Sequence, residues 1–188
     1  MNETIQTILK RRSVRVYQPK QIDEKEMQLI VQAGQNAPSA MGQQPWHFTV
    51  LQNSALLEKL EVLCKASFLN SDNQALREMA SREEFRVFYH APTLVIISGD
   101  SKAIAPLQDC TLAMENMLLA ATSLGIGSCW VHSPMMVYEG PEGPASLNAL
   151  GLNFPECHRP YAAAVFGYSN LPLPEAGARK TDTVTFVR

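Results

Sequence analysis

The segment from Pro106 to Leu124 constrains the fold most, because its pattern predicts a helix that is apolar around most of its circumference. Its polar residues recur in pairs every seven residues, which places them on one narrow stripe. A helix of this kind must be covered on several sides, either within one large core or partly by a second subunit, and the pattern itself leaves both open. The polar pairs are Gln108–Asp109, Glu115–Asn116 and Thr122–Ser123.

The run from Thr93 to Ser98 is the clearest strand signal. Its β-branched and apolar residues predict a central strand that is buried on both faces. Weaker runs predict further strands at residues 47–51, 128–131 and 161–167, and residues 184–187 could add an edge strand, perhaps on a partner subunit.

Apolar residues at helical spacing predict further helices at residues 3–10, at 23–34, from 54 onward with Leu57, Leu60 and Leu63 inward, and at 145–150. Asp23 with Glu26 has the form of a capping box. A second box, Ser81 with Glu84, predicts a helix that carries Phe85 and Phe88 on one side. The stretches 70–76 and 132–144 are expected to be irregular, and 170–180 is expected to be extended.

Composition narrows the class of protein. A chain of 188 residues with 46% hydrophobic and 18% charged residues fits one globular domain over residues 1–188. The net charge of -2 argues against nucleic acid as a partner. The four cysteines and four histidines show no metal-ligand spacing, so we expect no metal. No apolar run is long enough to cross a membrane, and a cytoplasmic protein with free thiols is the expectation.

Two short stretches carry the chemistry. Arg11, Arg12, Ser13 and Arg15 place three guanidinium groups and a hydroxyl within five residues, which suits a phosphate. The loop from Ala37 to Trp46 combines two prolines and a flexible glycine with polar amides and apolar surface, which suits a flat heteroaromatic ligand. Taken singly, each stretch is better explained without a ligand, the first as a solvated charge run and the second as an ordinary loop.

Together, the two stretches resemble the nitroreductase family of flavoproteins. That family opens with an Arg-rich motif containing Ser and continues with a Pro-Ser loop that ends in Gln-Pro-Trp. Gly127-Ser128-Cys129-Trp130 looks like a third landmark and Arg179-Lys180 like a fourth. The resemblance implies an α+β fold, with a central, mostly antiparallel sheet flanked by helices, in an intertwined homodimer. The four landmarks span residues 11 to 180, and their order and spacing are more specific than any one of them.

The resemblance also implies that FMN binds at the subunit interface, and it assigns residues to each part of the cofactor. Arg11, Ser13 and Arg15, with Arg12 as a further candidate, would contact phosphate, ribityl chain and ring edge, and Arg179 would close over the phosphate. The residues that would reach the ring from the other subunit are Pro38, Ser39, Ala40 and Met41, with Gln44 nearby.

This chain departs from the family pattern at two places. Gly42 stands where many relatives have Asn, and Gln43 would replace that hydrogen bond. Relatives often have Glu-Gly where this chain has His132-Ser133. The backbone there, or Gly127, would approach the reactive edge of the ring.

The function implied is an oxidoreductase in which NADH or NADPH reduces FMN and is replaced by a nitroaromatic, a quinone or a similar small acceptor, in ping-pong order. No paired acid and base is placed in the candidate loops, so no catalytic side chain is expected. Two alternatives stay open: a flavin carrier or sensor without turnover, and a flavin-dependent dehydrogenase or dehalogenase of the same fold.

Overall fold

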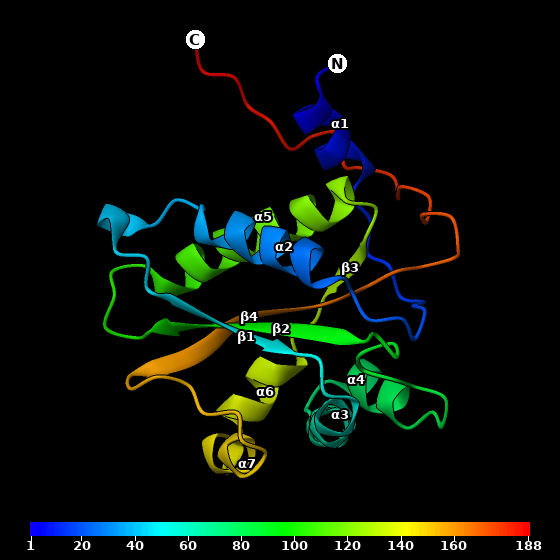
Figure 1. The fold of residues 1–188 in the computed structure, drawn as a ribbon, viewed down its shortest axis with the longest axis vertical. Coiled ribbons are helices and arrows are strands. Elements are labelled where there is room, and N and C mark those ends of the chain that lie inside the picture. Colours follow the sequence, from blue (N-terminus) through cyan, green and yellow to red (C-terminus); the bar gives the residue numbers. More distant parts are fainter.

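The computed structural model describes all 188 residues, and its centre is a four-stranded sheet in the order β1-β2-β4-β3 (Figure 1). Every neighbouring pair of strands is antiparallel, which confirms the predicted α+β class. The strands are β1 (Trp46–Leu51), β2 (Thr93–Asp100), β3 (Gly127–Trp130) and β4 (His158–Gly167).

Strands β2 and β4 form the middle of the sheet and are covered on both faces. Seven of the eight residues of β2 are buried, as the continuous apolar run predicted. In β4, the small side chains of residues 162–164 are fully buried opposite Val95–Ile97. Small residues let a helix pack closely on the sheet.

Helices cover the two faces of the sheet as separate layers (Figure 1). One layer holds α2 (Glu24–Gln35) and α5 (Pro106–Ser123), with α1 (Glu3–Lys10) at its edge. The other layer holds α3 (Ser54–Leu69), α4 (Gln74–Ala80), α6 (Ser133–Glu139) and α7 (Gly143–Ala149). Two apolar cores result, of 16 and 19 buried residues, one on each face.

Helix α5 confirms the predicted helix at residues 106–124 but is not enclosed by this chain. Its inward side is buried along Cys110, Met114 and Met117, whereas Leu107 and Leu112 are exposed. A single chain therefore leaves part of the apolar circumference of α5 uncovered. No helix of the chain combines the length and the apolarity needed to cross a bilayer.

Local signals explain where α2 begins. The Asp23 carboxylate accepts a hydrogen bond from the Lys25 N–H, as a cap should. Glu26 does not accept the Asp23 N–H directly, as a capping box would require. The Tyr168 hydroxyl bridges the two residues, because it accepts from the Asp23 N–H and donates to the Glu26 carboxylate. Gly34, predicted as the stop, lies inside the helix and is buried.

Three predictions about irregular and helical stretches were wrong. The stretch 70–76 contains the start of α4, which Asn73 caps through the Ala75 and Leu76 N–H groups. No helix follows Ser81, because that residue ends α4 and only turns follow it. Residues 132–144 hold all of α6 and the start of α7, because a proline in the first turn of a helix costs no hydrogen bond.

The C-terminal segment after β4 is exposed and has no regular secondary structure from residue 168 to 188. Residues 170–180 thus form no helix or strand, and their extended course stays a prediction. Residues 184–187 form no strand within this chain, although Val184 and Phe186 are apolar and exposed.

Candidate functional site

The arginine-rich segment leaves the end of α1 and runs along the edge of the sheet. Ser13 forms an isolated parallel bridge with Ser128, and the Val14 N–H donates to the Ser128 carbonyl at 2.9 Å. This pairing fixes residues 11–15 against β3. The first and third landmarks are therefore adjacent in space although they lie far apart in sequence.

Arg11, Ser13 and Arg15 gather near the Cys129 thiol. Burial raises the pKa of Cys129, while the charges of Arg15 and Arg11 and a hydrogen bond with Ser13 act in the opposite direction. Arg15 is exposed, and its guanidinium carbon lies 5.9 Å from the centre of the Tyr89 ring. The Arg11 Nε lies 3.8 Å from Glu115 Oε1, a long ion pair that a stronger anion can displace.

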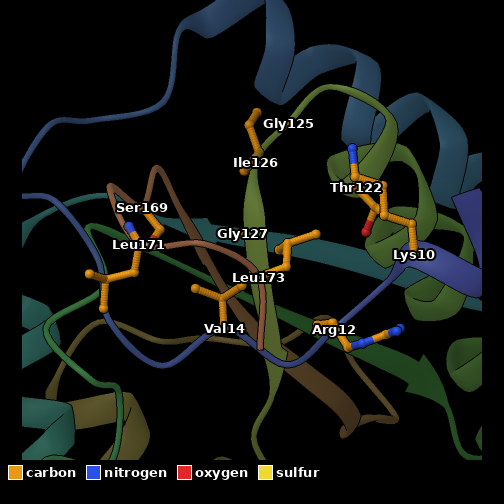
Figure 2. Close-up of a pocket in the computed structure, with 10 residues that line it drawn as sticks. All are labelled: Lys10, Arg12, Val14, Thr122, Gly125, Ile126, Gly127, Ser169, Leu171 and Leu173. Atoms are coloured by element: carbon orange, nitrogen blue, oxygen red, sulfur yellow. Dashed lines mark hydrogen bonds between the residues drawn. The ribbon is translucent and has the colours of Figure 1, made fainter. Parts of the chain in front are cut away.

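Arg12 lines a different space. Its Nη1 donates to the carbonyls of Leu9 and Arg11, which caps the end of α1, and its buried Nε has no partner. With Lys10 it supplies positive charge to a cavity of about 200 Å³ that contains no carboxylate (Figure 2). The other lining residues are Val14, Thr122, Gly125, Ile126, Gly127, Ser169, Leu171 and Leu173.

Gly127 is required by packing. A Cβ on this residue would lie 2.9 Å from Val14 Cγ1, which is closer than real Cβ contacts, and 3.2 Å from the Gly167 carbonyl oxygen, which is tighter than most. The glycine therefore lets the arginine-rich segment lie close to β3.

The connection from β3 to α6 offers unused donors. The backbone N–H groups of His132 and Ser133 donate to no group of this chain. The His132 side chain is exposed, and the Ser133 hydroxyl is buried without a partner. Unused donors of this kind suit a ligand with acceptor atoms on one edge.

The Pro-Ser loop has an unusual backbone. Met41, Gly42 and Gln44 all have positive φ, at 52°, 67° and 47°. The glycine adopts this conformation freely, but Met41 and Gln44 adopt it at a cost in strain. Met41 is also 88% exposed, so an apolar side chain is held out in solvent.

Hydrogen bonds hold this strained loop. The Ser39 hydroxyl accepts from the Gln44 N–H, and the Gln43 side-chain oxygen accepts from the Ile104 N–H, both at 3.0 Å. The Ala40 N–H donates to the Asp109 carboxylate at 3.0 Å. Pro38, the remaining predicted residue of the loop, is exposed.

The loop and the arginine-rich segment lie at opposite ends of α5. Asp109, near the start of α5, contacts the loop, and Thr122, near its end, lines the cavity with Arg12. Thirteen residues of helix separate the two, which is about 20 Å at 1.5 Å per residue. Figure 1 shows the loop at the left of the view and the segment after α1 at the right. One chain does not bring the two predicted halves of the site together.

Arg179 lies in the exposed C-terminal segment and forms no ion pair within this chain. Its predicted approach to a phosphate is therefore not built by the chain alone. No three His, Cys, Asp or Glu side chains are grouped as a metal ion would need.

Sequence reasoning missed Asp109, Tyr89 and Cys129 as neighbours of the site. Asp109 was one of the regular polar positions of the helix, and only its burial distinguishes it from the others. Tyr89 and His90 have positive φ, at 54° and 57°, which no local sequence signal indicates.

Comparison with known proteins gives consistent results. The family model named "Nitroreductase family" matches residues 8–168. An NADPH-flavin oxidoreductase of Vibrio harveyi is 31% identical over 170 residues, covering 83% of this chain and 67% of its own length.

Two solved structures match over the full length of both chains. A nitroreductase with bound FMN from Bacteroides fragilis has a TM-score of 0.89 and is 42% identical. A second nitroreductase with bound FMN, from Desulfitobacterium hafniense, has a TM-score of 0.87 and is 28% identical.

Proposed function

This chain belongs to the nitroreductase family, and we propose that it binds FMN and transfers electrons from NADH or NADPH to a small acceptor such as a nitroaromatic or a quinone. The observation that carries the proposal is the full-length similarity, at 42% identity, to a nitroreductase that holds FMN. The arrangement of polar groups at residues 11–15 and 132–133 supports it independently.

The residues present fit FMN chemically. A phosphate needs cations and donors, and Arg11, Arg12, Ser13 and Arg15 supply them beside β3, with Arg179 free to approach. A ring edge with acceptor atoms needs donors, and the unused N–H groups of His132 and Ser133 supply two. Gly127 keeps the arginine-rich segment close to these donors. When bound, FMN supplies the redox chemistry by accepting a hydride and passing electrons to an acceptor.

A homodimer completes the site in this proposal. Within one chain, the arginine-rich segment and the Pro-Ser loop lie at opposite ends of α5, so one chain supplies only one half of each site. A two-fold axis would bring the loop of one subunit to the arginine-rich segment of the other. The loop residues concerned are Pro38, Ser39, Ala40, Met41, Gln43 and Gln44. The exposed apolar residues of α1 and α5 would be covered by the same contact.

The chain's own part in turnover is positioning. The loop would hold an apolar surface, led by Met41, against one side of the ring, and the His132–Ser133 backbone would donate to its edge. Both lower the barrier by fixing geometry, not by moving a proton. NADH or NADPH and the acceptor would use the same open face in turn, which gives ping-pong kinetics.

The purified protein should be yellow. Unfolding should release FMN that passes an ultrafiltration membrane, and the refolded apoprotein should bind added FMN again. A colourless protein that cannot be reconstituted would contradict the proposal. Oxidation of NADH or NADPH with a nitro or quinone acceptor separates an enzyme from a carrier or sensor. A panel that includes halogenated phenols separates a reductase from a dehalogenase. Cytoplasmic location, the single-domain organisation and a lack of nucleic-acid partners stay predictions.

Replacing Arg11 or Arg179 with Ala should weaken FMN binding. A hydrogen bond to an ionised group contributes roughly 1.5–3 kcal/mol, so each change should raise the FMN dissociation constant about ten- to a hundredfold. Arg159→Ala is the control, because Arg159 pairs with Glu139, on α6. Fluorescence titration of the apoprotein with FMN measures the effect, and unchanged affinity in both variants would remove these residues from the phosphate site.

A further inference from the structure

Asp109 is a buried carboxylate without a countercharge. It is 3% exposed and sits in the first turn of α5, and no cation of the chain lies within 4.0 Å of it. Oδ1 accepts the hydrogen bond from the Ala40 N–H, and Oδ2 is buried with no partner. The first turn of a helix favours a carboxylate, but the buried Oδ2 without a partner still lowers stability, so a role beyond folding is needed to explain it.

Asp109 binds the backbone N–H of Ala40, the residue directly before the strained part of the loop. Ala40 is followed by Met41 and Gly42, both with positive φ, and a Met in that conformation persists only where its surroundings fix it. The hydrogen bond from Gln44 to Ser39 lies within the loop itself. Asp109 is the buried side chain outside the loop that fixes the loop to the helix layer.

We propose that Asp109 is a positioning residue that acts on the partner subunit's cofactor site. Its carboxylate fixes Ala40 and thereby sets the position and direction of residues 38–41. These residues project from the start of α5, about 20 Å from the arginine-rich segment of the same chain. The inference rests on the proposed function, and it adds that a helix side chain in one subunit controls FMN binding in the other.

The first test compares three variants of the full-length protein. Asp109→Ala removes the acceptor and should raise the FMN dissociation constant about ten- to a hundredfold. Asp109→Asn keeps an oxygen for the Ala40 N–H and should stay within about threefold of the wild type. Asn116→Ala is the matched control, because Asn116 also lies on α5 and donates to a backbone carbonyl, that of Ala33, outside the loop. It should lower thermal stability without changing FMN affinity.

The second test asks in which subunit Asp109 acts. Two differently tagged chains, one with Asp109→Ala and one with Arg11→Ala, are co-expressed and the mixed dimer is purified. If the loop contributes to the site of the partner subunit, one site of the mixed dimer combines an unaltered loop with an unaltered arginine-rich segment. The other site then combines both altered segments. Half of the sites should then bind FMN with wild-type affinity, although neither parent dimer has such a site.

The outcomes are distinguishable. Full FMN affinity in Asp109→Ala, or an equal loss in the Asn variant, would overturn the positioning role and leave the proposed function intact. A mixed dimer with no wild-type site would show that the loop acts within its own subunit. A wild-type protein that binds no FMN would instead overturn the proposed function itself.

Discussion

His132 is the exposed side chain nearest to the unused backbone donors, and it is the one residue there that could carry a proton. Its ring makes no hydrogen bond with the chain, and it does not cap α6. In the proposed function, the backbone at this position, and not the imidazole, donates to the ring edge.

His132→Ala should therefore retain FMN and its reduction by NADH or NADPH. We expect a change of less than about tenfold in the rate constant for reduction, measured by stopped-flow absorbance. A loss above about a hundredfold, roughly 2.7 kcal/mol in the barrier, with FMN still bound would show that a side chain takes part.

Glu61 gives a prediction about pH. Burial raises the pKa of this carboxyl above its ordinary value of 4.5, and a hydrogen bond from the Val87 N–H and the charges of His90 and Arg86 only partly oppose this. Because the folded pKa is the higher one, the group's contribution to stability is full below pH 4.5 and is lost as pH rises through the folded pKa.

Glu61→Gln keeps an acceptor for Val87 and removes the charge. The fall in unfolding free energy as pH rises above 4.5 should become smaller in this variant, measured by urea denaturation between pH 4.5 and 7. Glu58→Gln, an exposed carboxyl on the same helix, should keep the wild-type slope. An identical slope in Glu61→Gln and the wild type would contradict the assignment.

At the scale of elements, the strands and longer helices were predictable because their patterns repeat over many residues. The apolar run at 93–98 predicts a buried strand, and the repeating polar pairs at 106–124 predict a helix. The wrong predictions fall where a short signal has two interpretations. Ser81 carries a good N-terminal capping pattern, but Asn73 caps a helix first and Ser81 ends it.

The packing of elements was less predictable than their existence. Gly34 looked like a helix stop, yet it lies where α2 meets β1 and α5. A Cβ there would lie 2.8 Å from Phe48 Cε1 and 2.9 Å from Met117 Cγ. Asp109 illustrates the same limit for the site, because sequence shows a polar residue on a helix but not what packs over it.

Gly34→Ala tests this close contact. Alanine favours a helix over glycine by about 1 kcal/mol, while overpacking costs typically about 1–3 kcal/mol, so we expect a net loss of stability. Gln32→Ala, on the exposed side of α2, should be nearly neutral. Urea unfolding measures both, and a Gly34→Ala protein more stable than the wild type would show that the layers separate easily.

At the scale of the whole molecule, apolar surface collects where a partner would lie. Ile5, Ile8 and Leu9 form an exposed apolar side on α1, which has no buried residue. The wild type should be a dimer at micromolar concentration. A single charged residue in this side, Ile8→Glu, should shift sedimentation toward monomer and release FMN together.

Gln6→Glu is the control, since it adds the same charge at a polar, exposed position of the same helix. It should leave the dimer and its FMN unchanged. A folded wild-type monomer at micromolar concentration would contradict the two-fold arrangement, and a dimeric Ile8→Glu protein would exclude α1 from the contact.

In the proposed dimer, α5 carries one half of a site at each end, so its length would matter as much as its composition. One residue inserted between Asp109 and Thr122 would lengthen the helix by about 1.5 Å and rotate one end by about 100° relative to the other. The loop and the cavity would then face different directions, although every side chain and both termini of the helix stayed intact. Substitutions within α5 can be absorbed one at a time, whereas an insertion or deletion there would misalign both sites of a dimer at once.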